Sequence, residues 1–240
     1  MSTTKSLHQT QPNKVRAKEV SELEKDIVAR LAVLAGHRTA DIRSVRKDFS
    51  RLLAERPPAL VIALALRLAR DSETVPKFFA YELIQHHPQA LRSLNSKSLS
   101  KLGQGNSSWG EVDSFACYLA GPVWRERQVS DSLIERWACS QDRWWRRTSL
   151  ASTIALNNKA RGGRGDARRT LLICEKLIHD RDDMVVKALS WALRELSKRD
   201  AQSVRKFLAE HSNELAPRVV REVNSKLQTG LKNPRSRIVR

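Results

Sequence analysis

Residues 183–198 read DMVVKALSWALRELSK, and this stretch points to the fold class. Its aliphatic residues recur at steps of three and four, the spacing of one face of an α-helix. They are Val185, Leu189, Ala192, Leu193 and Leu196. A stripe of this kind is stable in water only when it packs on a neighbouring element, so the segment predicts a helix buried on one side by other helices.

The same segment has a second face with a different composition. Lys187, Trp191, Arg194 and Lys198 follow one another at steps of four, three and four residues. A tryptophan among three cations indicates a surface that meets DNA. Taken alone, Trp191 could equally be a partly buried core residue.

Residues 108–114 (SWGEVDS) combine an aromatic and an acidic residue in a similar way. Trp109 and Asp113 stand four residues apart and therefore share one helix surface. Val112, Phe115 and Leu119 form a separate apolar stripe. The pair is a candidate site, but Asp113 could instead pair with a nearby arginine or cap a neighbouring helix.

The composition indicates a polyanionic partner. The chain has 240 residues, with 44 Lys and Arg against 26 Asp and Glu, a net charge of +18 and an isoelectric point near 10.5. Residues 141–240 alone have 23 basic and 11 acidic residues. Nucleic acid is the first expectation from this surplus, although ribosomal and other RNA-binding proteins share the bias.

Cysteine content and hydropathy indicate the cellular compartment of the protein and the partners it lacks. Cys117, Cys139 and Cys174 are odd in number, and no CxxC pair is present, which argues against zinc and against a disulfide framework. We expect all three to be buried thiols in a reducing cytoplasm. The longest apolar run, 59–66, is far shorter than the ~20 residues that a membrane span needs. We therefore expect a cytoplasmic, nucleoid-associated protein with no membrane, metal or cofactor partner.

From about Lys14 onward the pattern is helical almost throughout, and no β-type alternation persists. Antiparallel helix pairs that recur about every 35–45 residues are typical of HEAT-like repeats. We predict an all-α fold, an α-solenoid of antiparallel HEAT-like helical repeats with a concave basic groove for DNA. A compact, non-repetitive helical domain is the alternative. The predicted organisation is a disordered tail over 1–13, one domain over 14–230 and a basic mobile tail over 231–240.

Capping and breaking residues set the expected helix boundaries. We expect Thr39 to cap a helix whose Leu52 and Leu53 face inward, Pro88 to end a helix, and Gly121-Pro122 to end the helix that begins at Trp109. Further helices are expected near 59–70, 166–179, 183–198, 200–211 and 217–230.

Three segments together resemble one known family. They are WGEVD at 109–113, WWRR at 144–147 and KALSWALRE at 187–195. In order and spacing they resemble the DNA alkylation repair enzyme family, HEAT-like-repeat glycosylases of alkylated purines. The resemblance covers residues 20–230 in outline and is most specific from 105 to 200.

The resemblance implies a solenoid that grips double-stranded DNA and excises positively charged alkylpurines such as 3-methyladenine and 7-methylguanine. It implies that Trp109 and Trp191 are the aromatic cleft residues and that Asp113 is the catalytic carboxylate. Arg147 matches the family's DNA-contacting arginine, with Arg146 as the adjacent alternative.

The chain departs from the family pattern near its N-terminus. Active members usually carry an aromatic residue, often Tyr, in an early helix that helps to enclose the lesion. The matching stretch here, residues 29–36 (ARLAVLAG), has no aromatic residue. This departure puts the lesion-side wall of the cleft and the range of substrates in question.

Other cations are candidates for contacts with the DNA backbone. They are Arg143, Arg146, Arg147, Lys187, Arg194, Lys198, Arg161 and Arg164. The last two lie in the Gly-rich loop KARGGRGD at 159–166, which is not a Walker A loop because the Lys-Ser/Thr ending is missing. That loop could equally be a flexible turn with Asp166 as the cap of the next helix.

Three functions remain open from the sequence. The first is a monofunctional glycosylase, expected to act as a monomer and without a Schiff-base lysine. The second is a non-catalytic DNA-binding protein of the same family, which the missing N-terminal aromatic favours. The third is a HEAT-type adaptor that binds an acidic protein partner.

Overall fold

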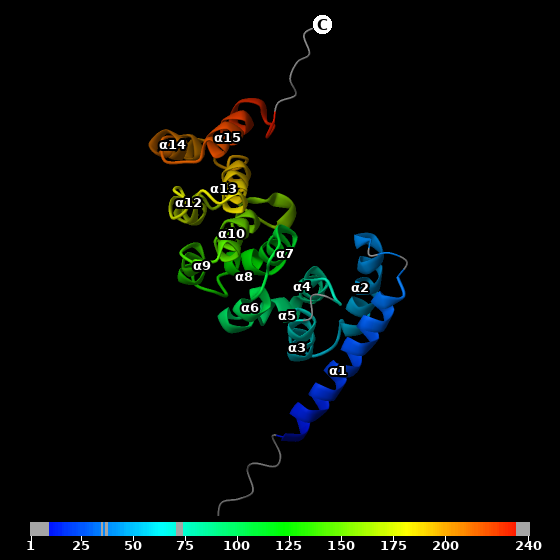
Figure 1. The fold of residues 1–240 in the computed structure, drawn as a ribbon. Helices are drawn as coiled ribbons and strands as arrows, with labels where there is room; N and C mark the ends of the chain where they lie inside the picture. The colour runs from blue at the N-terminus through cyan, green and yellow to red at the C-terminus, as the bar shows by residue number, and fades with distance from the viewer. Residues whose placement is uncertain (1–9, 35, 37, 71–73, 234–240) are drawn as a thin grey trace, which may run out of the picture. The chain divides into compact units, whose positions relative to one another are not determined.

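The computed structural model describes residues 10–34, 36, 38–70 and 74–233. Over these residues the chain forms helices and no β-strand, which confirms the all-α prediction (Figure 1). The chain divides into two compact units, unit 1 from Met1 to Gln104 and unit 2 from Gly105 to Arg240. The prediction of a single domain over 14–230 stays a prediction.

Unit 1 contains six helices within its described residues. They are α1 (Thr10–Ala32), α2 (Thr39–Leu53), α3 (Pro58–Leu68), α4 (Lys77–Gln85), α5 (Pro88–Arg92) and α6 (Ser96–Gly103). Its core includes Phe49 and Phe79, whose rings meet edge to face at 6.5 Å. A buried carboxylate, Glu82, is held by Arg43 at 2.8 Å and by Arg46 at 3.1 Å. Burial of this charge is tolerated because both arginines neutralise it.

Several boundaries in unit 1 differ from the sequence predictions. Helix α1 begins at Thr10, inside the predicted tail, most of which lies outside the described residues. Thr39 is the first residue of α2 and not its cap, and Leu52 is exposed while Leu53 is buried. The helix before Pro88, α4, ends at Gln85 as expected, and Pro88 also opens α5, since proline fits the first turn, where its missing N–H has no partner to lose.

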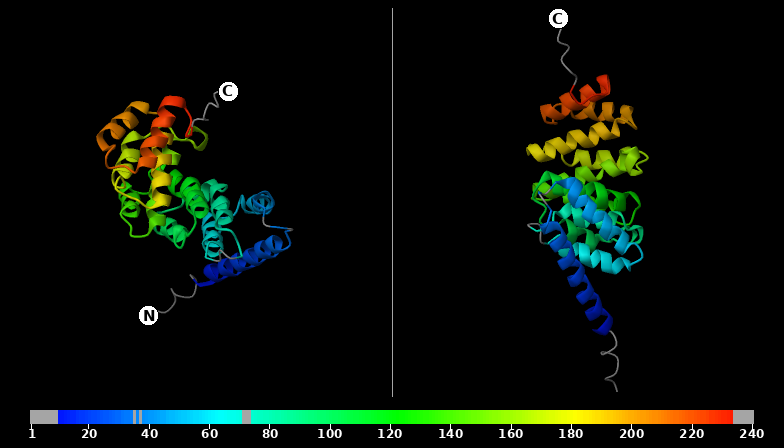
Figure 2. Two further views of the ribbon diagram at one scale, coloured as in Figure 1. Left: turned by 45° about the horizontal axis from the view of Figure 1, so that its top comes forward. Right: turned by 90° about the vertical axis from the view of Figure 1, so that its right-hand side faces the viewer.

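Unit 2 contains the remaining described helices. They are α7 (Trp109–Phe115), η1 (Ala116–Ala120), α8 (Gly121–Arg125), α9 (Asp131–Ala138), α10 (Arg143–Ser152), α11 (Ile154–Asn157), η2 (Lys159–Arg161), α12 (Ala167–Glu175), α13 (Asp183–Leu196), α14 (Ala201–His211) and α15 (Pro217–Thr229). These helices stack in two rows (Figures 1 and 2). In one row α10 packs on α7 and η1, α13 packs on α10, and α15 packs on α13. In the other, α9 lies against α10, while α12 and α14 lie against α13. The solenoid and its groove stay predictions.

The helix that begins at Trp109 does not end at Gly121-Pro122, so that prediction was wrong. It passes through one turn of π-helix, η1, in which the N–H of Gly121 donates to the carbonyl of Ala116, five residues earlier. The helix then continues as α8, with Pro122 in its first turn. A wider turn ahead of Pro122 accommodates a ring that would otherwise clash with the carbonyl four residues before it.

The continuous helix formed by α7, η1 and α8 is called the rod below. Gly121 allows the rod to approach its neighbours closely. A Cβ atom at this position would lie 2.5 Å from the carbonyl oxygen of Ser152 and 2.7 Å from the Cβ of Ala155. Both distances are shorter than a van der Waals contact, so any side chain here would push α8 away from the end of α10 and from α11.

We predict that Gly121→Ala lowers the free energy of unfolding by about 1–3 kcal/mol, the usual result of overpacking a tight interior. Chemical denaturation of the purified protein measures this change. Gly110→Ala, in the same rod, is the matched control, because a Cβ there meets no atom within 4 Å. The control is expected to be neutral or stabilising by up to ~1 kcal/mol. Equal effects at the two positions would contradict the packing argument.

Candidate active site

Asp113 lies in α7 and is held by an arginine from α10. Arg147 donates from Nε to Oδ1 of Asp113 at 2.9 Å and from Nη2 to Oδ2 at 2.7 Å. Two parallel bonds of this kind fix both the position and the plane of a carboxylate. The Arg147 side chain is 7% exposed and that of Asp113 is 20% exposed, so the carboxylate is the more accessible member of the pair.

The third partner of Arg147 is a main-chain group. Its Nη1 donates to the carbonyl oxygen of Met184 at 2.6 Å. Met184 lies in the first turn of α13, which the Asp182 side chain caps by accepting from the N–H of Met184 at 2.9 Å. The site therefore joins α7, α10 and α13, three successive helices of one row.

The pKa of Asp113 is raised above the ordinary value for aspartate. Burial is the largest cause, because a partly dry environment disfavours the charged form. The hydrogen bonds and positive charge of Arg147 lower the pKa and offset part of that effect. Arg147 therefore offsets part of the cost of burying the charged carboxylate and fixes its orientation, while the Asp113 side chain stays partly accessible to a ligand.

Trp109 stands at the start of α7, one turn before Asp113. Its side chain is 63% exposed, which is unusual for a residue of this size. The helix beneath it is capped by Ser108, whose hydroxyl accepts from the N–H of Glu111 at 3.3 Å. An indole with this much free surface next to a carboxylate can stack on a flat or cationic ligand.

Trp191 lies on α13, seven residues after Met184, and is half-buried. Seven residues make nearly two full turns, so the side chains of Trp191 and Met184 lie on the same helix face, about 10 Å apart along the axis. Lys187 lies on the same face between them. A place for Trp191 in one site with Asp113 and Arg147 stays a prediction.

A cluster of aromatic rings packs behind α7. Phe115 meets Trp137 and Trp145 at centroid distances of 6.2 and 6.3 Å, and the two tryptophans stack at 4.8 Å. Trp124 is fully buried, and its Nε1 donates to Asp131 at 2.8 Å. Trp124 and Trp137 are therefore buried packing residues, whereas Trp144 and Trp145 are both half-buried.

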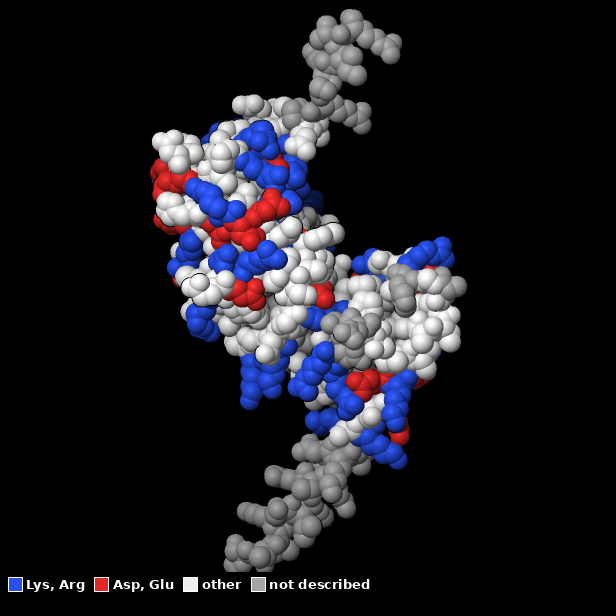
Figure 3. Space-filling model, in the orientation of Figure 1, with Lys and Arg blue, Asp and Glu red and all other residues white. Residues whose placement is uncertain are grey.

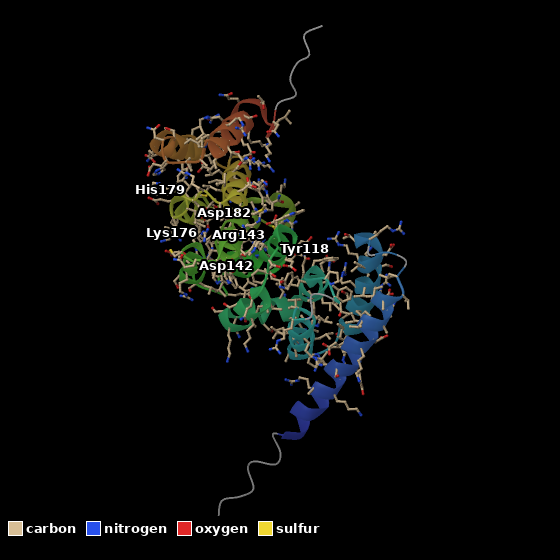
Figure 4. The ribbon with its side chains drawn as sticks, in the orientation of Figure 1. Tyr118, Asp142, Arg143, Lys176, His179 and Asp182 are labelled. Carbon is tan, nitrogen blue, oxygen red and sulfur yellow. The ribbon has the colours of Figure 1, made fainter. Side chains whose placement is uncertain are left out.

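Two other arginines of α10 link it to the turn before α13. Arg146 donates to Asp180 at 2.7 Å and to the carbonyls of Ser140 and Gln141 at 3.0 and 2.8 Å. Arg143 lies beside Asp182, 3.4 Å away, with its guanidinium over the ring of Trp144 (Figure 4). Arg146 is therefore engaged inside the protein, whereas Arg143 is exposed. Contact of either residue with DNA stays a prediction.

The cations of the segment 187–198 also have polar or acidic partners. Lys187 pairs with Asp183 and Lys198 pairs with Glu195, both at 2.6 Å. Both lysines are exposed. Asp183 is exposed as well, and such a surface pair is worth about 0–1 kcal/mol, so a phosphate can replace this partner of Lys187. Glu195 is buried, so Lys198 neutralises a carboxylate inside the protein. Arg194 is half-buried and donates to Ser190 at 3.1 Å. Figure 3 accordingly shows Lys and Arg interspersed with Asp and Glu on the visible face of unit 2.

In the Gly-rich loop, Arg161 and Arg164 have different environments. Arg161 places its guanidinium 5.2 Å from the ring centroid of Tyr118, which lies in η1. Arg164 is exposed and forms no ion pair with the residues that the structure describes. Asp166 caps α12 by accepting from the N–H of Arg169 at 2.9 Å, as predicted for that position.

The cysteines correct one expectation. Cys117 and Cys174 are buried, and burial raises the pKa of the Cys117 thiol to about 12. Cys139 is exposed, because it follows the last residue of α9 and not a buried turn. The prediction that all three are buried was therefore wrong for Cys139.

The sequence analysis named Asp113, Trp109 and Arg147 as candidates. It missed two groups that position the side chains around them. The carbonyl of Met184 has no sequence signature, because every residue has one. Tyr118 lies within a predicted helix, and its pairing with Arg161 depends on the unforeseen π turn. Within the described ranges, no cluster of three or more His, Cys, Asp or Glu side chains is arranged to hold a metal ion.

Comparison with known protein families identifies the family of this chain. The family model described as DNA alkylation repair enzyme matches residues 13–227, nearly the whole chain. The chain belongs to the DNA alkylation repair enzyme family. Among curated proteins, none matches the sequence. Membership associates the chain with repair of alkylated DNA. No described helix combines the length and apolar character needed to cross a membrane.

We predict that Asp113 titrates above the ordinary aspartate value and that Arg147→Gln raises its pKa further. The charged form loses its cationic partner in that variant while burial remains. Carboxyl-carbon NMR of selectively labelled protein follows the titration. Asp200, whose pKa is lowered by hydrogen bonds from Ser203, lies outside the site and is the internal control, and its pKa should stay the same. A lower Asp113 pKa in the variant would contradict the electrostatic argument.

Proposed function

We propose that this protein is a monofunctional DNA glycosylase that removes positively charged alkylpurines, of the 3-methyladenine and 7-methylguanine type, from duplex DNA. The observation that carries the proposal is the Asp113 carboxylate, oriented by two bonds from buried Arg147 and presented outward beside exposed Trp109. Family membership supports DNA as the substrate. No metal or organic cofactor is needed for this chemistry.

The bond that breaks joins C1′ of deoxyribose to a ring nitrogen of the purine. Its electron pair goes to the base, which leaves neutral because alkylation had already made it cationic. Protonation of the leaving group is therefore unnecessary, and we assign no general acid. Positive charge develops on the sugar, as in other glycoside hydrolysis, and a nearby carboxylate stabilises it.

Asp113 has two tasks in this scheme. Its negative charge stabilises the cationic sugar, and its free lone pairs accept a hydrogen bond from the water that attacks C1′. The proton that the water loses passes to the carboxylate or to solvent, and an abasic site remains. No lysine is assigned as a Schiff-base nucleophile, so strand cleavage is not part of the proposal.

The tryptophans contribute their ring faces. The negative face of an indole attracts a cation by about 0.5–2 kcal/mol, and both the alkylated base and the developing sugar cation fit this description. Trp109 is the more accessible of the two, and Trp191 lies on the α13 face that also bears Lys187.

The backbone contacts are assigned to the exposed cations first. Arg143, Lys187, Lys198 and Arg164 are exposed, as phosphate contact needs, and Arg161 is half-buried. Arg147 serves mainly to orient Asp113, because its Nε, Nη1 and Nη2 already donate to that carboxylate and to the carbonyl of Met184. Arg146 and Arg194 contribute to the positive potential more than to direct contact. We propose a monomer that acts on DNA in the cytoplasm.

We predict that Asp113→Asn reduces release of 7-methylguanine and 3-methyladenine from methylated duplex DNA by at least about 10²-fold, the usual effect of removing a preorganised charge. Single-turnover release with excess enzyme is the measurement. Glu210→Gln, which removes a carboxylate on α14 outside the site, is the control and should match wild type. Thermal melting of each variant checks its folding.

Retention of DNA binding by Asp113→Asn together with lost release would support the proposal. Failure of the wild type to release either base, despite binding the duplex, would overturn it and favour a non-catalytic DNA-binding member of the family.

We also predict that Trp109→Leu lowers the single-turnover rate by roughly 2- to 30-fold, the equivalent of about 0.5–2 kcal/mol of cation–π attraction. Trp109→Phe should retain most of the rate because it keeps an aromatic face. The side chain is exposed, so folding should be unchanged. Equal losses in the Leu and Phe variants would argue against a role for the ring face.

A further inference from the structure

A polar pocket lies at the other end of the rod that carries Asp113. The rod runs without interruption through α7, η1 and α8, and Arg125 is its last residue. Arg125 comes twelve residues after Asp113, so these two residues are roughly 15–18 Å apart along the rod. The pocket at the Arg125 end has a volume of about 220 Å³. Its lining includes Arg125, Glu126, Arg164, Gly165, Asp166 and Arg169.

The wall of this pocket is a loop that two arginines hold in place. Nη1 of Arg125 donates to the carbonyls of Ala155, at 3.4 Å, and of Arg161. From the end of α13, Arg199 donates to the carbonyl of Asn157 at 2.8 Å. The side chain of Asn157 accepts from the N–H of Asp166 at 3.0 Å and closes the loop. Hydrogen bonds thus hold the loop in one conformation.

Two glycines are required by this construction. Gly162 has φ +79°, and a Cβ there would lie 3.1 Å from Nη1 of Arg125. A Cβ at Gly163 would lie 2.7 Å from the backbone of Asn157. The glycines of the loop are therefore explained by the close approach of Arg125 and of the main chain.

The pocket retains unused hydrogen-bond donors. Arg169, 5% exposed, uses Nε for Asp166 at 2.6 Å and Nη1 for the carbonyl of Trp124 at 2.8 Å. Arg125 uses Nε for Glu126 at 2.8 Å and Nη1 for the loop carbonyls. Among the described residues, these bonds leave Nη2 of both arginines for another acceptor.

The charge of the lining is also unbalanced. Asp166 is neutralised by Arg169, and Glu126 is neutralised by Arg125. Arg164 has no acidic partner among the described residues, so one positive charge remains in surplus at the pocket. The volume lies below the ~300–1,000 Å³ of typical small-molecule sites. A single small anion fits this combination better than a whole nucleotide does.

We propose that the pocket of Arg125, Arg164 and Arg169 binds one phosphate group of the duplex, on a stretch of backbone away from the sugar that Asp113 faces. The planar fork of arginine suits the tetrahedral oxygens of a phosphate. This inference rests on the proposed DNA substrate but not on cleavage of the glycosidic bond. A free phosphoryl compound is the other source of the same chemistry.

The first test is the salt dependence of binding to an unmodified duplex. Arg164→Ala should make the slope of log K against log salt concentration shallower by about 0.9, the value for one phosphate contact. Arg205→Ala is the matched control, because Arg205 is exposed on α14, outside the pocket. Its slope should equal that of wild type. Arg164 makes no ion pair with described residues, so its removal should leave folding intact.

The second test observes the pocket directly. Nε of Arg169 is followed by ¹⁵N NMR in the full chain during titration with duplex and, separately, with inorganic phosphate at constant ionic strength. We expect the duplex to shift this signal in wild type and much less in Arg164→Ala. A shift with phosphate but not with duplex, and an unchanged slope, would keep the phosphate site and assign it to a free phosphoryl compound. No shift with either ligand would overturn the proposal.

Base release from methylated duplex separates the two proposals. Release by wild type with no effect of Arg164→Ala on the slope would overturn the contact between this pocket and the duplex and leave the glycosylase intact. The expected slopes and NMR shifts without base release would overturn the glycosylase and leave the pocket intact.

Discussion

The guanidinium of Arg147 is the point at which three helices of unit 2 depend on one another. A buried cation has to be paired, and Arg147 obtains its partners from α7, through Asp113, and from the first turn of α13, through the carbonyl of Met184. Removing one partner of such a pair typically costs about 3–5 kcal/mol, because the other charge is left uncompensated. The position of the carboxylate is therefore set by how α10 packs between its two neighbours.

The neighbouring arginines of α10 extend the same principle. Arg146 binds Asp180 and Arg143 approaches Asp182, so the turn that precedes α13 is attached to α10 beside the Met184 contact. Further along the row, Arg218 of α15 pairs with Asp183 at the start of α13. Arginines of α10 and of α15 thus both contact the start of α13. This explains why many cations of a strongly basic chain are engaged within the protein.

The sequence predicted most of the helices, because their apolar spacing is strong. Val185, Leu189 and Leu193 are buried as their periodicity required, and α13 begins at Asp183 as expected. The errors have local causes. Gly121-Pro122 signals a helix end in isolation, and only the π turn and the tight contact with Ser152 explain why the helix continues. Asp113 was a candidate by spacing, but its orientation depends on a main-chain carbonyl that no sequence pattern can reveal.

Net charge alone therefore does not locate the surface that meets DNA. Arg146 and Arg169 are basic residues whose guanidiniums mainly organise the protein, while Arg164 has no acidic partner within the described chain. The distinction follows from burial, because an arginine buried among carbonyls and carboxylates cannot move out to a phosphate and displace the counterions of the DNA without breaking internal bonds. Positions such as Arg164, exposed on a loop that Arg125 and Arg199 hold in place, combine an available charge with a fixed location. A phosphate contact made there costs little conformational entropy, and this favours such a loop over a flexible lysine as a point of attachment to a nucleic-acid backbone.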